Sequence, residues 1–388
     1  MEKQKEVSTI EQLDSLIYEA IAKSASDIHI ESTIDNARVR YRIDGILYDQ
    51  SPIDASKASQ VISRVKVLAN INISEKRIPQ DGKFIVNVQG SSIDLRVSTF
   101  PSIYGEKVVI RILDRHKNML ALDSLGFSGE MLEQFADIIN KPSGFFLVTG
   151  PTGSGKTTTL YAALSCLNKP EKNIITLEDP VEYNLDGITQ GQIHPDAGFT
   201  FQKGVRALLR QDPDVAMVGE IRDKETAKTA IEAALTGHMV FSTLHTNDAP
   251  GAIMRLMDMK IEPFLINAAL TGVLAQRLVR KNCQNCLREV SPTSHDAKIL
   301  DRLGLQVDTL YEGAGCDDCF GLGYKGRMGI FELLVMSGEL RSLIVEFPRF
   351  DDIRSQAVLD GMKGLIGDGI KKVKQGSISL KELARVAF

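Results

Sequence analysis

A glycine-rich segment near the middle of the chain has the residue types and spacing of a phosphate-binding loop. It is the run Gly150-Pro151-Thr152-Gly153-Ser154-Gly155-Lys156-Thr157. Glycines let successive backbone N–H groups curl around the α and β phosphates, while the Lys156 ammonium can reach the β and γ oxygens and the Thr157 hydroxyl can ligate Mg²⁺. We therefore expect this segment, with Thr158 beside it, to bind a nucleoside triphosphate and Mg²⁺.

The residues on either side of the loop have the patterns that such a loop needs. The apolar run 145–148 directly precedes it and predicts a strand. Leu160, Leu164 and Leu167 repeat on one face and predict a helix from 158 to 167. A glycine-rich turn that matched the motif by accident would lack this strand and helix.

Polar residues follow three further apolar runs, at 173–177, 215–218 and 239–243. Strand and helix patterns alternate here, which predicts a parallel sheet of an α/β fold. Polar groups at the carboxyl ends of parallel strands lie beside a phosphate loop. The candidates to orient water, hold Mg²⁺ or sense the γ-phosphate are therefore Glu178, Glu182, Glu220 and His245. For each residue alone, a purely local role at a strand end is the alternative.

Four of the five cysteines form two Cys-x-x-Cys pairs, namely Cys283, Cys286, Cys316 and Cys319. In a chain with this composition, four thiolates around one tetrahedral Zn²⁺ are the interpretation we favour, and disulfides or a redox site are the alternatives. A site with four protein ligands is closed, so its expected role is in folding and not in catalysis. We expect Cys166, on the helix after the loop, to be a small buried packing residue.

The first part of the chain has the pattern of a small α/β domain. Ser8 or Thr9 can cap a helix, and strands at 26–31 and 37–43 alternate as half-buried strands do. The second strand carries a row of cations on one face, which is either a solvated face or a ligand-binding one, namely Arg38, Arg40 and Arg42.

A second pair of arginines comes together if two later strands form a hairpin. The strands are expected at 94–100 and 107–113, after another at 83–88, and a turn centred on Ile103 and Tyr104 places Arg96 opposite Arg111. Like charges so placed repel each other unless an anion or a carboxylate lies between them. Pairing with acidic neighbours such as Asp94 is the alternative.

Length and composition indicate a globular chain of more than one domain. With 388 residues, 43% of them hydrophobic and 25% charged, the chain has the values of ordinary folded proteins. We expect an N-terminal α/β domain at 1–113, an interdomain linker at 114–128 and a nucleotide-binding domain at 129–388. The last of these would include a zinc-binding subdomain at about 280–325 and a C-terminal helical region.

The charge pattern constrains the partners of the chain. Its first residues are charged and no apolar run is long enough to span a bilayer, so we expect neither a signal peptide nor a membrane helix. These features fit a soluble intracellular enzyme that reaches a membrane only through partners. A net charge of -4 and a pI near 6.0 argue against a bulk affinity for nucleic acid.

Three strings around the strand ends carry a family resemblance. Residues 177–183 (LEDPVEY) resemble the aspartate box, 210–223 the atypical Walker B segment, and 236–247 the histidine box. The likeness covers nearly the whole chain, including residues 26–31, 42–45, 96–99, 105–107 and 323–327. Together these strings resemble the ATPases that power type II secretion and type IV pilus assembly.

The resemblance implies a RecA-like motor domain behind a smaller N-terminal domain, assembled as a hexameric ring at the cytoplasmic face of the inner membrane. The ligands implied are ATP, Mg²⁺ and Zn²⁺. Glu220 matches the Walker B acid that holds Mg²⁺, and Glu178 is its rival for activating water. The other matching residues are the γ-phosphate arginines and the histidine-box residues, Arg96, Arg111, His238 and His245. The cysteines match the zinc-bearing subdomain of the secretion and assembly branches, which retraction motors generally lack.

We therefore expect an ATP hydrolase that moves pilin-like subunits through an inner-membrane platform protein. The alternatives are a retraction motor, a nucleic-acid translocase, and a nucleotide-gated scaffold that barely hydrolyses ATP. Only about two dozen residues precede Ser26, whereas type II secretion members usually carry a further N-terminal domain. This predicts either a short member of the pilus or competence type or a truncated chain.

Overall fold

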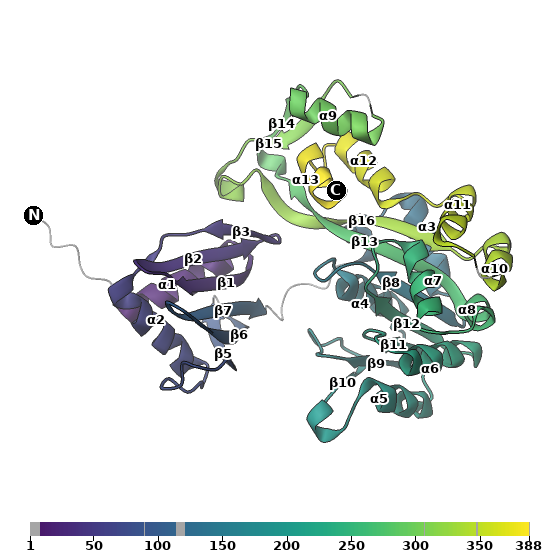
Figure 1. Ribbon diagram of the computed structural model, residues 1–388, viewed down its shortest axis with the longest axis horizontal. Helices are drawn as coiled ribbons and strands as arrows, with labels where there is room; N and C mark the ends of the chain where they lie inside the picture. Colours follow the sequence, from purple (N-terminus) through teal and green to yellow (C-terminus); the bar gives the residue numbers. More distant parts are fainter. Residues whose placement is uncertain (1–7, 89, 114–120, 306, 347, 388) are drawn as a thin grey trace, which may run out of the picture. The chain divides into compact units, whose positions relative to one another are not determined.

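The computed structural model describes residues 8–88, 90–113, 121–305, 307–346 and 348–387 of the chain (Figure 1). These residues form two compact units, which span Met1–Asn118 and Met119–Phe388. Of the linker predicted at 114–128, residues 114–120 lie outside the described residues, and α3 begins at Gly129.

The first unit is a single sheet with two helices on one face. Its strands lie in the order β3-β2-β1-β7-β6-β5, with β4 paired to β2. The elements are α1 (Thr9–Ala22), β1 (Ala25–Ser32), β2 (Asn36–Ile43), β3 (Ile46–Asp49), β4 (Ile53–Asp54), α2 (Ala55–Leu68), β5 (Gln80–Val88), β6 (Ser91–Ser102) and β7 (Gly105–Leu113). The predicted cap is confirmed, since the Ser8 hydroxyl accepts from the Glu11 N–H in a capping box.

Alternation along the strands gives this sheet an apolar face and a charged face. Ile28 and Ile30 of β1 are buried together with Leu13 and Ile17 of α1. On β1 the residues between them are polar and lie on the other face, where charged residues of β2 and β7 are their cross-strand neighbours. The helices therefore cover one side of the sheet, and the cations of β2 lie on the opposite side.

The second unit is built on a mostly parallel sheet with the strand order β10-β9-β11-β12-β8-β13-β16. All neighbouring pairs are parallel except β13 and β16. The strands are β8 (Gly144–Thr149), β9 (Ile174–Glu178), β10 (Thr189–Gln192), β11 (Val215–Val218), β12 (Met239–Leu244), β13 (Leu270–Asn282) and β16 (Tyr324–Val335). The parallel sheet predicted from the alternation of strands and helices is confirmed.

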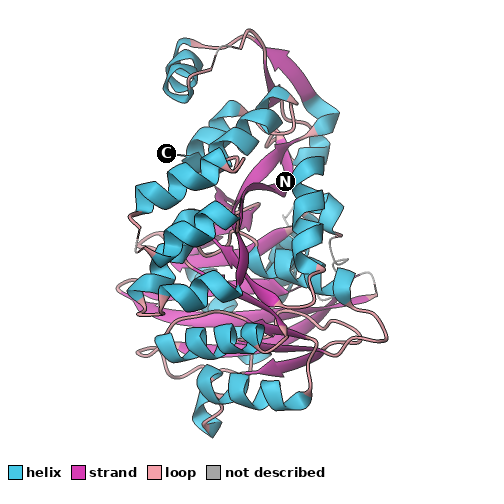
Figure 2. Ribbon diagram, turned by 90° about the vertical axis from the view of Figure 1, so that its right-hand side faces the viewer, coloured by secondary structure: helices cyan, strands magenta, loops and turns pink. Residues whose placement is uncertain are grey.

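Helices cover both faces of this sheet (Figures 1 and 2). Phe145 and Leu147 of β8 belong to a core with residues of α5 (Phe201–Leu208), α6 (Lys224–Leu235), α7 (Ala249–Asp258), α8 (Pro263–Ala269), α10 (Gly338–Val345) and α11 (Phe350–Leu359). Phe146 and Val148, which alternate with them, pack with residues of α3 (Gly129–Ile139) and α4 (Lys156–Leu167). Burial on both sides explains why the run 145–148 of β8 is apolar.

A third core joins the cysteine-bearing segment to the C-terminal helices. Val279 of β13 and Ile330 of β16 pack with residues of α9 (Ser294–Leu303), β15 (Leu310–Gly313), α12 (Leu365–Lys374) and α13 (Leu380–Ala387). The strand β14 (Leu287–Val290) pairs with β15. The long antiparallel pair of β13 and β16 therefore links this segment to the parallel sheet.

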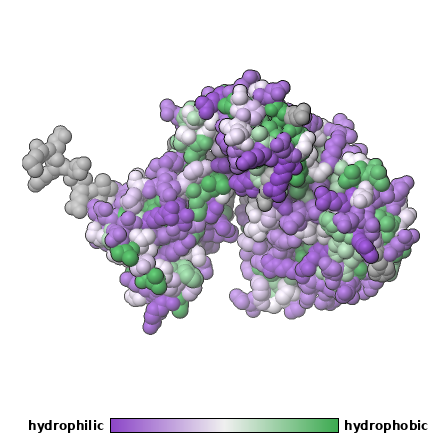
Figure 3. All heavy atoms as spheres, turned by 45° about the horizontal axis from the view of Figure 1, so that its top comes forward, coloured by the Kyte–Doolittle hydropathy of each residue, from purple (hydrophilic) through white to green (hydrophobic). Residues whose placement is uncertain are grey.

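The structure corrects one packing prediction and adds strands that the sequence analysis did not predict. Cys166 is exposed, because Leu164 and Leu167 occupy the inward side of α4. Strands β10, β13 and β16 had no clear period-two signal; in β13, residues 270–276 are all buried, so polar and apolar residues do not alternate there. Polar side chains dominate the surface in Figure 3, and within the described residues no helix combines the length and hydropathy needed to cross a bilayer.

Candidate nucleotide-binding site and metal centre

The glycine-rich loop connects the end of β8 to the start of α4, as a phosphate-binding loop requires. Gly150, Gly153 and Gly155 all have positive φ, at 149°, 77° and 88°. At Gly150 a Cβ atom would lie 2.5 Å from the main-chain oxygen of Gln276, so no larger residue fits there. Gly155 directly precedes α4, so the free N–H groups of the first helical turn face the loop.

Lys156 lies folded over its own loop. Its Nζ donates to the carbonyl oxygens of Gly150 and Pro151, at 2.9 and 3.1 Å. Burial lowers the pKa of this lysine, and the charge of Arg277 adds to that effect, whereas Glu220 opposes it. Carbonyl groups are weaker partners for an ammonium than phosphate oxygens, so the bonds that hold Lys156 are ones a polyphosphate can replace. Thr157 and Thr158, in the first turn of α4, are half-buried.

Glu220 and His245 lie at the carboxyl edge of the sheet, beside the loop. Glu220 follows β11 and His245 follows β12, which is the neighbour of β8. His245 Nε2 is 3.7 Å from Glu220 Oε2, and the Arg222 guanidinium donates to the other carboxylate oxygen. Burial and the charge of Lys156 lower the pKa of His245, although Glu220 opposes them, so the imidazole is neutral at pH 7.

Glu178 is close to the same edge but is buried and held by protein donors. It is 3% exposed, and its carboxylate accepts from the hydroxyls of Tyr161 and Thr176. The Gln190 amide donates to it at 3.2 Å. Glu182 is exposed and only its N–H approaches this network, 3.4 Å from the Tyr161 hydroxyl. Both oxygens of Glu178 are therefore engaged, which leaves Glu220 as the more accessible carboxylate.

His238 lies at the other end of β12 from His245. It directly precedes Met239, which pairs with Gly144 at the start of β8, whereas the loop follows the end of β8. Its Nδ1 is 2.9 Å from the carbonyl oxygen of Ala233. The structure therefore does not bring His238 to the phosphate loop of its own chain.

In the first unit, Arg96 and Arg111 are directly opposite each other on β6 and β7, which confirms the predicted register. Arg111 Nε is 3.1 Å from Asp27, a carboxylate that is 7% exposed. Arg96 is exposed and has no ion pair among the residues that the structure describes. In contrast, Arg38 is paired with Asp49. An exposed, uncompensated arginine beside a second one is a place where an anion would be stabilised.

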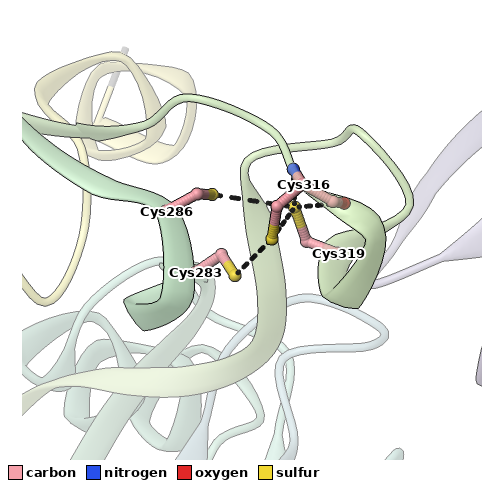
Figure 4. A group of neighbouring side chains, drawn as sticks. All are labelled: Cys283, Cys286, Cys316 and Cys319. Atoms are coloured by element: carbon pink, nitrogen blue, oxygen red, sulfur yellow. Dashed lines mark hydrogen bonds between the residues drawn. The ribbon is translucent and has the colours of Figure 1, made fainter.

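The four paired cysteines come together at one point, as Figure 4 shows. The Sγ atom of Cys316 lies 3.9 Å from the Sγ of Cys283 and 3.7 Å from that of Cys319. The Sγ atoms of Cys286 and Cys319 are 3.8 Å apart. Tetrahedral zinc with bonds of about 2.3 Å separates its sulfur ligands by about 3.8 Å. These separations are too long for disulfides. Backbone N–H groups also point at the sulfurs, including that of Gly323 at 3.2 Å from Cys319. The cluster therefore fits a metal ion.

Two polar residues beside the loop were missed by the sequence analysis. Gln276 and Arg277 follow the apolar run at the start of β13, and Ala275 pairs with Thr149 just before the loop. The Arg277 guanidinium donates to Asn247 O at 2.8 Å, in the segment after His245. The signal that could have found this pair is the same as for Glu220, namely polar residues after an apolar run. The boundary was hidden because β13 continues to Asn282.

The parallel sheet, its strand order and the loop after β8 define a RecA-like P-loop fold. A solved structure of the pilus retraction motor PilT with bound ADP has a TM-score of 0.63 to this chain, with 28% identity over 96% of each chain. The ATPase DotB from Legionella pneumophila, at 22% identity and a TM-score of 0.72, shares the fold. The chain also matches, over residues 2–385, the family model described as Type II/IV secretion system protein. It belongs to that family.

Curated relatives resemble the chain over most of its length. It is 50% identical over 373 residues to the type IV pilus assembly ATPase PilB of Thermus thermophilus and 46% identical over 386 residues to the type II secretion system ATPase E of Vibrio cholerae. These alignments cover 95% and 100% of this chain. The chain spans 42% of the length of the first relative and 76% of the second.

The accessibility of the two carboxylates predicts different effects of removing their charges. Glu220→Gln should leave ATP binding nearly intact and lower kcat by about 100-fold or more, because the charge that would hold Mg²⁺ or polarise water is lost. Glu178→Gln should lower kcat less, because its carboxylate is engaged by the protein. Single-turnover hydrolysis and equilibrium ATP binding measure both effects. A larger loss in kcat for Glu178→Gln would assign water activation to Glu178.

The sulfur geometry predicts one zinc ion per chain. Metal analysis of protein purified without chelator should give about one Zn²⁺, and Cys283→Ser should lower that content because a thiolate ligand is lost. Cys166→Ser, a change at the exposed cysteine outside the cluster, is the control and should keep the zinc. Hydrogen exchange after chelation should rise first around residues 280–325, before ADP binding weakens. Zinc-free wild-type protein would contradict this assignment.

Proposed function

We propose that this chain is an ATP hydrolase that drives type II protein secretion or the assembly of type IV pilus subunits. The observation that supports this most directly is the complete phosphate loop with Lys156, Glu220 and His245 gathered at one edge of the parallel sheet. The family and the relatives named as assembly and secretion ATPases support the same activity. We further propose that the two units act as an N-terminal domain at 1–113 and a motor domain at 129–388.

In this proposal each residue of the site has a role that its chemistry supports. Lys156 would neutralise the β and γ phosphates after leaving its carbonyl partners, and Thr157 and Glu220 would hold Mg²⁺. When bound there, Mg²⁺ would supply the positive charge that polarises the phosphate. His245, neutral at pH 7, can donate one N–H to the γ-phosphate. Glu178, with Glu182 nearby, keeps the strand ends ordered around the site, and the role of His238 in the histidine box stays a prediction.

In this proposal Arg96 and Arg111 contact the γ-phosphate, in addition to the residues around the phosphate loop. Their opposition leaves excess positive charge that a γ-phosphate would neutralise, and the buried carboxylate of Asp27 orients Arg111. Loss of the γ-phosphate would weaken that attraction and let one domain move against the other. We propose a homo-oligomer, a hexameric ring, attached through an inner-membrane platform protein at the cytoplasmic face, with zinc in the cysteine cluster.

The retraction motor is the second candidate, since PilT has 28% identity to this chain. Relatives named for assembly and for secretion reach 50% and 46%, which favours assembly over retraction. A nucleic-acid translocase remains the alternative that salt-dependent, ATPase-stimulating DNA binding would support. A nucleotide-gated scaffold that barely hydrolyses ATP would release almost no phosphate.

The first test of this function is Lys156→Ala. ATP hydrolysis should fall at least about 100-fold while the fold survives, because the flexible cation aimed at the β and γ phosphates is lost. Phosphate release from the assembled protein measures this loss. Lys169→Ala, at an exposed lysine just after the other end of α4, is the control and should keep full activity. Normal turnover by folded Lys156→Ala protein would refute the site.

The second test compares ATP hydrolysis with ADP binding in Arg96→Ala. Hydrolysis should fall about 100-fold while ADP affinity changes less than about threefold, because ADP lacks the phosphate that the arginine would contact. Arg38→Ala, on the same face of the sheet but paired with Asp49, should change neither quantity. Equal losses in ATP turnover and ADP affinity for Arg96→Ala would show that the arginine has a structural role.

A further inference from the structure

The side chain of Gln276 contacts the phosphate loop from a neighbouring strand. It is 1% exposed, and its Nε2 donates to the carbonyl oxygen of Ser154 at 2.6 Å. Its Oε1 accepts from the Thr159 hydroxyl at 2.8 Å. One carboxamide therefore joins the loop to the first turns of α4, across more than a hundred residues of sequence.

The chemistry of these partners determines which way the carboxamide faces. The Ser154 carbonyl can only accept a hydrogen bond, so it needs the NH₂ group, whereas the Thr159 hydroxyl can donate to the oxygen. The reverse orientation would place two acceptors 2.6 Å apart inside the protein. A residue here must donate at one end and accept at the other, which leucine, methionine and glutamate cannot do.

Fixing the Ser154 carbonyl also fixes the N–H group of Gly155. The two groups belong to one planar trans peptide and point in opposite directions. Because the carbonyl points to Gln276, the Gly155 N–H points away from β13. Gly155 has a φ of 88°, and a Cβ atom on it would lie 3.1 Å from Gln276 Nε2, so the absence of a side chain is what lets the carboxamide approach.

We propose that Gln276 is a positioning residue for nucleotide binding. Its carboxamide holds the Ser154–Gly155 peptide in the orientation that offers the Gly155 N–H to the β-phosphate. This inference rests on the proposed function of the loop. It assigns a role in binding to a residue of β13, outside the loop, the strand-end acids and the histidine box. Since ADP and ATP both carry the β-phosphate, both should depend on Gln276.

The test is Gln276→Met in the 388-residue chain, which keeps a long unbranched side chain but removes both hydrogen-bonding groups. Equilibrium binding should weaken for ADP and for a non-hydrolysable ATP analogue alike. The expected loss is between about fivefold and 100-fold, the range that corresponds to one lost buried hydrogen bond. In steady-state hydrolysis KM should rise more than kcat falls, because the lost contact is made in ground state and transition state alike.

Thr271→Val is the matched control, because Thr271, also on β13, makes a buried hydrogen bond to β8 at the end of that strand away from the loop. Its hydroxyl donates to Phe145 O at 3.0 Å. This variant should lower the unfolding temperature yet change ADP affinity less than about twofold. Gln276→Met must therefore lose clearly more ADP affinity than Thr271→Val at a similar loss of stability. Equal ADP affinities in the two variants would overturn the inference.

Thr159→Val keeps the test decisive if Gln276→Met does not fold. It removes only the anchor of the carboxamide oxygen, and should weaken ADP binding about threefold. If Gln276→Met folds, adding Thr159→Val to it should lower ADP affinity little further, because both changes break the same hydrogen-bond network. Unchanged ADP affinity in Thr159→Val would count against the inference. Failure of wild-type protein to bind ADP, or normal ATP turnover by Lys156→Ala, would instead remove the proposed function itself.

Discussion

A phosphate loop works only if several backbone N–H groups point at one place, and the rest of this structure is arranged around that requirement. Three glycines with positive φ supply the curvature, and α4 begins directly after the third. N–H groups that converge without a ligand are exposed to water at the loop, so only the buried surroundings can keep them oriented. Strand β8, buried throughout and placed between β12 and β13, provides those surroundings.

The charged side chains around the loop are arranged so that a bound polyphosphate would give them stronger partners than they have now. Within the described part of the chain, Lys156 has only carbonyl oxygens as hydrogen-bond partners, and its depressed pKa reflects the loss of water around it. Glu220 is held by Arg222 and lies near His245. A bound nucleotide with Mg²⁺ would have to redistribute these contacts, since Glu220 cannot serve the arginine and a metal shell equally. Lys156 and Glu220 can therefore exchange their present partners for a nucleotide and its metal ion. Glu178 keeps its own hydrogen-bond donors, Tyr161 and Thr176.

The first unit carries a related arrangement on the exposed face of its sheet. Most cations there have a carboxylate partner, as Arg38 and Arg40 do with Asp49 and Glu31. Such exposed pairs contribute little to stability, but they neutralise the surface locally. Among the residues that the structure describes, Arg111 pairs with Asp27 and Arg96 has no ion pair, so the excess positive charge is concentrated where these two arginines lie opposite each other. The cysteine cluster differs from both sites, because its closed set of four sulfurs leaves no position for a substrate.

The sequence by itself determined the features that depend on local or period-two patterns. These include the phosphate loop, the two cysteine pairs, the parallel sheet, and the opposition of Arg96 and Arg111, which follows from a short hairpin whose turn sets the register. Only the tertiary structure decided which side chains from distant segments meet. Gln276 reaches Ser154, Tyr161 engages Glu178, His238 lies at the opposite end of β12 from His245, and Cys166 is exposed. The physical reason is that strand order and helix rotation bring together residues far apart in the chain, and no local spacing encodes those contacts.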